Sequence, residues 1–117
     1  VLEATVDALV DLGARDISAR LGPCISPAAY EFSERDLTTM ALRFGPEVVG
    51  ATADGDAALD MAAAVRSALR SAGVDDVDVA AAACTATTIG ADGTPRYFSH
   101  RARADTGRQA SVIWIEP

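Results

Sequence analysis

Hydrophobic and polar residues recur along the chain with periods that predict three helices. Apolar residues spaced three and four apart, with charged or small residues between them, predict helices at about 2–12, 34–44 and 57–72. Ser33, followed three residues later by an acid, fits a capping pattern for the second helix. Asp56 is the expected cap of the third helix.

Alternation of apolar and polar residues predicts short strands at 16–21, 77–83, 97–98 and 110–115. The first strand leads into 22–27, where two prolines and a glycine exclude regular structure and predict a rigid loop. Strands and helices in this order are typical of an α+β or mixed α/β fold. We therefore expect a mixed β-sheet packed with about three helices, in a single region that covers 1–117.

Composition narrows the classes of function. The chain has 117 residues and a formal net charge of −7, which argues against general binding to nucleic acid or to an anionic membrane. No apolar run approaches the length of a membrane span. The two cysteines, Cys24 and Cys84, have neither zinc-finger nor disulfide-framework spacing, so free thiols in a reducing cytoplasm are expected.

One segment departs from the acidic character of the chain. Residues 96–108 hold four arginines and one acid, or +3, whereas residues 1–95 carry 15 acids and 6 arginines, or −9. Such a patch is a candidate anion site. The alternative is a solvated loop whose arginines pair weakly with nearby acids.

Several side chains are chemical candidates, each with a structural alternative. His100, the only histidine, is a candidate general base or metal ligand, or else a surface histidine without a catalytic role. Cys24 would act as a nucleophile only if the fold supplied a histidine, a cation or a helix amino terminus beside it. Cys84, at a predicted strand end, is expected to be a small core residue. Tyr30 and Phe98 would either stack on a flat ring or pack in the core.

Three stretches together resemble one family. They are LGPCISPAAYEF at 21–32, the helix at 59–74 followed by Cys84-Thr85, and RYFSHRARADTGRQASVIW at 96–114. In this order they are similar to the multicopper polyphenol oxidoreductase, or laccase-domain, proteins, which are now described as purine nucleoside phosphorylases. The chain departs from the family pattern in two places. Ala28-Ala29 stands where the family often has a cysteine pair, and His100 where it often has tyrosine.

The resemblance implies an activity and a metal. Members of the family bind zinc, or copper in older descriptions, through two histidines and one cysteine. They catalyse phosphorolysis of adenosine, inosine and guanosine, and also adenosine deamination. The motifs that carry those ligands are absent from this sequence, which opens inside a helical pattern without an initial methionine. The chain therefore looks like the carboxy-terminal part of a larger domain. We expect it to bind no metal and to be inactive by itself.

Our leading hypothesis is part of a purine nucleoside phosphorylase. Arg101 and Arg108 are the candidates for binding phosphate or substrate, because arginine matches oxyanions with a fork of donors. The loop that starts at Gly22 would add backbone donors, and Tyr30 or Phe98 would wall the base. We keep two alternatives. One is a non-catalytic assembly module that forms a homo-oligomer or pairs with an amino-terminal half; the other is a thiol hydrolase using Cys24 with His100.

Overall fold

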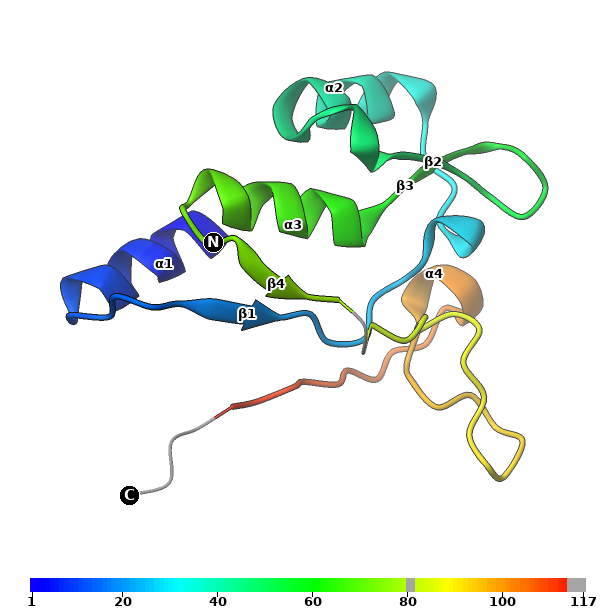
Figure 1. Ribbon diagram of the computed structural model, residues 1–117. Helices are drawn as coiled ribbons and strands as arrows, with labels where there is room; N and C mark the ends of the chain where they lie inside the picture. Colours follow the sequence, from blue (N-terminus) through cyan, green and yellow to red (C-terminus); the bar gives the residue numbers. More distant parts are fainter. Residues whose placement is uncertain (80–81, 114–117) are drawn as a thin grey trace.

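The computed structural model describes residues 1–79 and 82–113, and Figure 1 shows how its elements are arranged. Four helices and four three-residue strands follow one another in the order α1 (Leu2–Asp11), β1 (Ser18–Arg20), α2 (Glu34–Phe44), β2 (Val49–Ala51), β3 (Ala57–Leu59), α3 (Met61–Ser71), β4 (Asp76–Asp78) and α4 (His100–Arg103). Two short 3-10 helices, η1 (Pro27–Ala29) and η2 (Pro46–Val48), precede α2 and β2. The combination confirms the α+β class.

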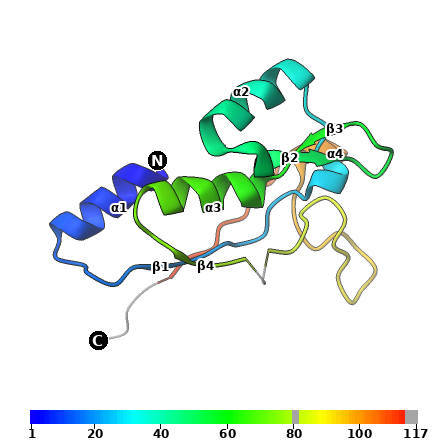
Figure 2. The same ribbon diagram turned by 45° about the horizontal axis from the view of Figure 1, so that its top comes forward.

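The strands form two small sheets. β1 and β4 are parallel, with Ala19 opposite Val77, and β2 and β3 are antiparallel, with Gly50 opposite Ala58. A parallel pair needs a long crossover connection. Here the connection between β1 and β4 includes α2 and α3, and α3 together with α1 covers one side of the β1–β4 pair (Figures 1 and 2).

Two apolar clusters form the core. The first joins Leu37 of α2 to Val48 and Leu59, whose exposed fractions are 0% and 1%. The second joins Val6 of α1 to Leu69 of α3 and to Val74. Alanines on α3, which leave room for close approach of neighbouring elements, contribute buried positions at Ala63, Ala64 and Ala68.

The predicted third helix begins later than the sequence pattern indicates. Residues 57–59 form β3, which pairs with β2, and Asp60 rather than Asp56 caps the helix by accepting a hydrogen bond from the N–H of Ala63 at 2.9 Å. A short run of apolar residues fits either a buried strand or one face of a helix, and the spacing of the residues alone does not distinguish the two. Tertiary pairing with β2 decides between them.

The carboxy-terminal part of the chain also differs from the prediction. Tyr97 and Phe98 belong to no strand, because the N–H of Phe98 bonds to the side-chain carbonyl of Gln109 (2.9 Å) instead of to a neighbouring strand. The described residues 110–113 are irregular, and positions 114–115 of the predicted last strand lie outside the described residues. Ser99 caps a four-residue helix, α4, that the sequence pattern did not predict.

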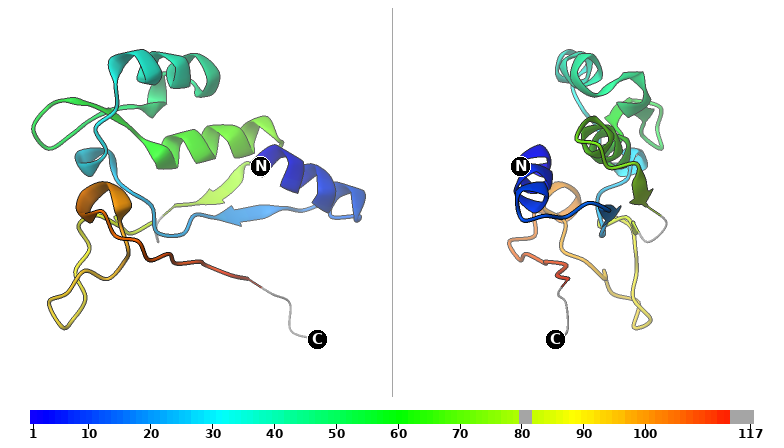
Figure 3. Two further views of the ribbon diagram at one scale, coloured as in Figure 1. Left: turned by 180° about the vertical axis from the view of Figure 1, so that it is seen from behind. Right: turned by 60° about the vertical axis from the view of Figure 1, so that its left-hand side comes forward.

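Large apolar side chains remain exposed at several places, among them α1 with the residue after it and the segment after α4. On α1 and just after it, Val10 is 54% and Leu12 is 86% exposed, although Val6 on the inner face is buried. In the segment after α4, Val112 and Ile113 are 76% and 97% exposed. This segment runs beside β1, on its other side from β4 (Figure 3). Within the described part of the chain, no helix is long and apolar enough to cross a membrane.

Candidate functional site

The predicted loop after β1 lies against two distant segments. Leu21 donates its N–H to the carbonyl of Asp78 at 2.9 Å, which extends the β1–β4 pairing into the loop. The backbone at Gly22 approaches Ser111 so closely that a Cβ placed on the glycine would lie 3.0 Å from the hydroxyl oxygen of that serine. The fold thus brings the loop, the end of β4 and the last described segment together.

The structure brings two of the predicted site residues into contact. The guanidinium of Arg101, on α4, lies over the ring of Tyr30, with 4.9 Å between its carbon and the ring centroid. Tyr30 follows η1 and is itself held edge-on by Phe32, with 5.5 Å between the ring centroids. A cation over an aromatic face is attracted by the ring quadrupole. Tyr30 therefore holds the Arg101 guanidinium in place and leaves the N–H donors of Arg101 unused.

Two further predicted residues, Phe98 and Arg108, both adjoin Gly107. Phe98 exchanges two hydrogen bonds with the side chain of Gln109, and a Cβ on Gly107 would overlap the Phe98 ring. Arg108 donates to the carbonyls of Thr106 and Gly107, both at 2.9 Å, and is exposed. Among the described residues, no hydrogen bond or ring contact joins Phe98 or Arg108 to Tyr30.

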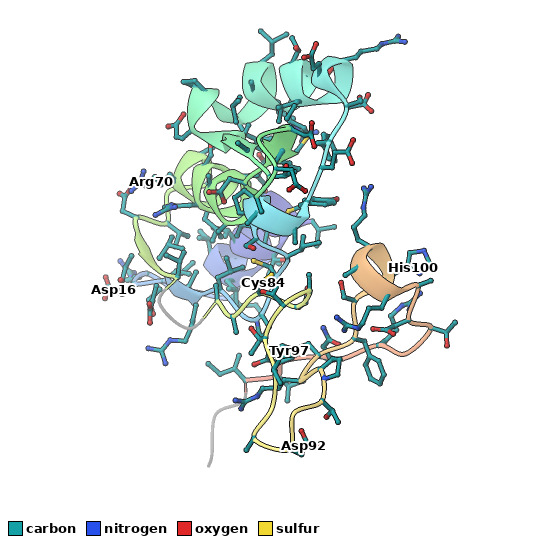
Figure 4. All side chains as sticks on the ribbon, turned by 90° about the vertical axis from the view of Figure 1, so that its right-hand side faces the viewer. Asp16, Arg70, Cys84, Asp92, Tyr97 and His100 are labelled. Atoms are coloured by element: carbon teal, nitrogen blue, oxygen red, sulfur yellow. The ribbon has the colours of Figure 1, made fainter. Side chains whose placement is uncertain are left out.

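His100 and Cys24 do not form a pair. His100 is exposed at the first position of α4 and faces away from Cys84, as Figure 4 shows. Cys24 is partly buried beside Cys84, and burial, followed by the Asp60 carboxylate and the Cys84 sulfur, raises the pKa of its thiol. The neighbours of Cys24 therefore disfavour the thiolate that a nucleophile needs.

An arginine that sequence reasoning missed supports the basic segment. Arg103 donates to the carbonyls of Ala86 (2.8 Å) and Tyr97 (2.6 Å) and forms an ion pair with Asp105 (2.9 Å). The N–H of Ser99 also donates to Asp105 at 2.8 Å. This hydrogen bond, and secondarily the Arg103 charge, lowers the pKa of Asp105 against the opposing effect of desolvation. Arg103 and Asp105 therefore fix α4 and position Arg101.

We expect Arg103→Ala to loosen this segment. The substitution removes the side-chain hydrogen bonds that join α4 to residues 86 and 97. Amide hydrogen exchange at Ser99 should become roughly tenfold faster, which corresponds to the free energy of about one hydrogen bond. Arg108→Ala, which removes only bonds to adjacent carbonyls, is the matched control and should change exchange little. Equal effects of the two substitutions would contradict a positioning role for Arg103.

The pH dependence follows from Asp105. Its pKa is lower in the folded chain than the ordinary aspartate value, so its contribution to stability is present above the ordinary pKa. The contribution is lost as the pH falls through the lower folded pKa. Protection of the Ser99 amide in the unsubstituted chain should therefore decline below about pH 4, and Asp105→Asn should remove the decline.

The thiol with unusual properties is Cys84 and not Cys24. The hydroxyl and the N–H of Ser26 lie 3.1 and 3.4 Å from the Cys84 sulfur. Burial raises the pKa of Cys84, but hydrogen bonds from Ser26 and Thr87 and from the N–H of Ala86 outweigh burial and bring the pKa to about 6. Hydrogen bonds to the charged form favour that form. These hydrogen bonds therefore favour the thiolate form of Cys84 at neutral pH.

We expect iodoacetamide to alkylate Cys84 before Cys24. The rate at Cys84 should reach half its maximum near pH 6, because alkylation follows the thiolate. Ser26→Ala removes the hydroxyl donor and should shift the midpoint upward. Peptide mapping of alkylated chains over a pH series measures both rates, and a Cys84 midpoint in the ordinary thiol range would contradict the stabilised thiolate.

The profile of the family described as "Multi-copper polyphenol oxidoreductase laccase" matches residues 1–116. The chain belongs to this family. Proteins named purine nucleoside phosphorylase, from Mycobacterium bovis and from two strains of Mycobacterium tuberculosis, are each 39% identical to it over 120 residues. The alignments cover 99% of this chain and 44% of each relative, so the laccase-family chain spans less than half the length of the curated relatives it matches. No solved structure matches it significantly.

The residues of this laccase-family chain do not fit a metal centre of the kind that the family name implies. Within residues 1–79 and 82–113, no group of three His, Cys, Asp or Glu side chains is placed to hold an ion. The one histidine, His100, is exposed on α4. The two cysteines lie opposite each other at a different place in the fold.

The sequence of this laccase-family chain contains only weak signals for the roles of Arg103, Asp105 and Cys84. Asp105 stands out as the one acid in the basic segment, but nothing in the spacing marks Arg103 as its partner. The pKa of Cys84 depends on Ser26, which lies on a different segment of the chain. The contact between Ser26 and Cys84 arises from the parallel pairing of their two segments. Local sequence patterns do not specify this pairing.

Proposed function

We propose that the chain is the carboxy-terminal part of a purine nucleoside phosphorylase and supplies its anion-binding arginine, Arg101. One observation carries the assignment to this residue. In the basic segment, Arg103 and Arg108 donate to backbone carbonyls, whereas the guanidinium groups of Arg96 and Arg101 have no hydrogen-bond or ion-pair partner within the described residues. Arg96 lies over the ring of its neighbour Tyr97 at 5.8 Å, but Arg101 lies over the ring of Tyr30, on a distant segment, at 4.9 Å. Its fork of N–H donors is held on Tyr30 and remains available to an oxyanion.

The chemistry of phosphorolysis needs such a group. A phosphate oxygen attacks C1′ of the ribose while the bond to the purine nitrogen breaks, and negative charge moves from phosphate to the departing base. A prepositioned cation beside the phosphate would hold this nucleophile against C1′ for the attack. Arg101 would bind phosphate, the loop from Gly22 would add backbone donors, and Tyr30 would wall the nucleoside.

The exposed apolar side chains support an incomplete domain. Leu12 and Ile113 are 86% and 97% exposed, although each would contribute more to stability in a core. An amino-terminal half would cover such surfaces and would bring the zinc or copper ligands and the principal acid and base. Adenosine, inosine and guanosine are the substrates we propose, with adenosine deamination as a further activity. The two free thiols are consistent with the cytoplasm as the compartment.

Phosphate-dependent release of hypoxanthine from inosine tests this proposal. We expect release from the protein in which the upstream sequence is restored and negligible release from this chain alone. Omitting phosphate is the control for simple hydrolysis. If neither form releases base, the assigned activity is wrong. If the chain alone releases base at the rate of the restored protein, the division of the site between two halves is wrong.

A second candidate function is assembly without catalysis. The exposed apolar residues on α1 and in the segment after α4 favour it, because large apolar patches mark association surfaces. A paired or swapped homo-oligomer would then complete the core. Mass in solution across a concentration series tests it: a dimer is the expected result, and a monomer at all concentrations would contradict assembly.

A further inference from the structure

Cys24 and Cys84 face each other across a parallel backbone pairing that lies beyond the ends of β1 and β4. Cys24 accepts the N–H of Thr85 at 3.0 Å and donates its own N–H to the carbonyl of Ala83 at 3.1 Å. These two bonds flank Cys84 and place the two cysteines directly opposite each other. Neighbouring strands lie about 4.8 Å apart. This separation falls within the roughly 4.4–6.8 Å between Cα atoms that a disulfide spans.

The two thiols have opposite environments. Cys84 accepts hydrogen bonds from both polar groups of Ser26, which stabilise its thiolate. Cys24 is more deeply buried and lies near the carboxylate of Asp60, and both effects keep its thiol protonated. A pair in which one sulfur is the ready nucleophile and the other resolves the adduct is the arrangement that thiol–disulfide exchange uses.

Neither sulfur is sealed in the core. Both cysteines are partly exposed, and both are free. Figure 4 shows Cys84 at the start of the long segment that leads to α4, outside the two apolar clusters. A small reagent can therefore reach the pair without unfolding the chain.

We propose that Cys24 and Cys84 form a thiol–disulfide exchange site whose substrates are low-molecular-weight disulfides. The pairing of the two backbones, the access and the Ser26 contacts carry this inference. It does not depend on phosphorolysis, on Arg101 or on the proposed amino-terminal half.

The reaction balances with a disulfide RSSR as the oxidant. The Cys84 thiolate attacks one sulfur of RSSR, a mixed disulfide forms on Cys84, and RS⁻ leaves and takes a proton from water. Cys24 loses its proton and attacks the Cys84 sulfur, and the second RS⁻ leaves. The two cysteines are oxidised to one disulfide, RSSR is reduced to two RSH, and no other reductant or oxidant is needed.

Oxidised glutathione is the probe. After incubation of the chain near neutral pH, the intact mass should fall by two hydrogens, and thiol titration should fall from two groups to none. Trypsin should then release peptides 21–35 and 71–96 joined by a bond that a reductant cleaves. A product that retains two glutathione adducts, a disulfide-linked dimer, or an unreacted chain would each overturn the proposal.

Two variants separate the roles of the cysteines. Cys24→Ala should stop at a stable mixed disulfide on Cys84. Cys84→Ala should form its adduct on Cys24 about tenfold more slowly near pH 6. Cys84 has the larger thiolate fraction, which raises its rate of attack, and this gain outweighs the lower intrinsic nucleophilicity of a thiolate with a low pKa. Ser26→Ala keeps both cysteines and should slow the first step alone, so it reports on the site even if a cysteine variant misfolds. Equal first-step rates in all three variants and the unsubstituted chain would overturn the assignment.

Discussion

Replacing Leu59 with alanine should destabilise the chain by about 3 kcal/mol, within the range of 2–5 kcal/mol typical of buried leucines. Leu59 ends β3 with 1% of its surface exposed and packs with Leu37 and Val48 in the larger apolar cluster. Its N–H also donates to the carbonyl of Tyr30 at 3.3 Å, so the same residue supports the ring beneath Arg101. Urea unfolding of the chain followed by circular dichroism measures the loss.

Leu42→Ala is the matched control for this substitution. The same atoms are removed from a leucine on α2 that is 86% exposed, so neither a cavity nor a large transfer term arises. We expect a change within about 0.5 kcal/mol, as for most surface substitutions. Equal losses from the two variants would contradict the position of the larger cluster.

Replacing Arg101 with alanine should lower kcat/KM for inosine phosphorolysis by about a hundredfold in the restored protein. Removing one partner of a hydrogen-bonded charge pair costs roughly 2–5 kcal/mol, and a hundredfold loss lies within this range. The KM for phosphate should rise, since the phosphate is the proposed ligand of the guanidinium. Arg101→Lys keeps the charge but loses the fork of donors, and it should recover only part of the rate.

Arg70→Ala supplies the control for the charge itself. Arg70 is exposed near the end of α3, and Figure 4 places it well away from the α4 end of the molecule. We expect its loss to leave the KM for phosphate unchanged. If Arg101→Ala also leaves that KM unchanged while phosphorolysis persists, the arginine that binds phosphate lies elsewhere, and the family assignment is unaffected.

Local sequence signals predicted several helix boundaries correctly. Ser33 caps α2 through a bond from the N–H of Asp36 at 3.1 Å, and α2 ends at its predicted last residue, Phe44, before Gly45, whose φ of 98° favours glycine. Both signals concern groups within four residues of each other. Such contacts form wherever the chain turns into a helix, so the residue types suffice to locate them.

The candidate site was predicted unevenly for the same reason. Sequence reasoning selected Tyr30 and Arg101 separately, and the fold brings them to 4.9 Å. It made Cys24 a conditional nucleophile and Cys84 a small core residue, whereas the pKa of each thiol depends on groups from another segment. Hydrogen bonds and burial shift a pKa through space, and proximity in sequence does not report them.

The sequence by itself determined the family, the α+β class, the acidic balance and the basic segment. These properties rest on residue types and on periods of two to four residues. Tertiary structure alone decided that 57–59 form a strand, that Arg103 supports the basic segment while Arg101 keeps its donors, and that Cys84 meets Ser26. Each of these depends on a contact between distant segments, whose partners are chosen by global packing and not by local propensity.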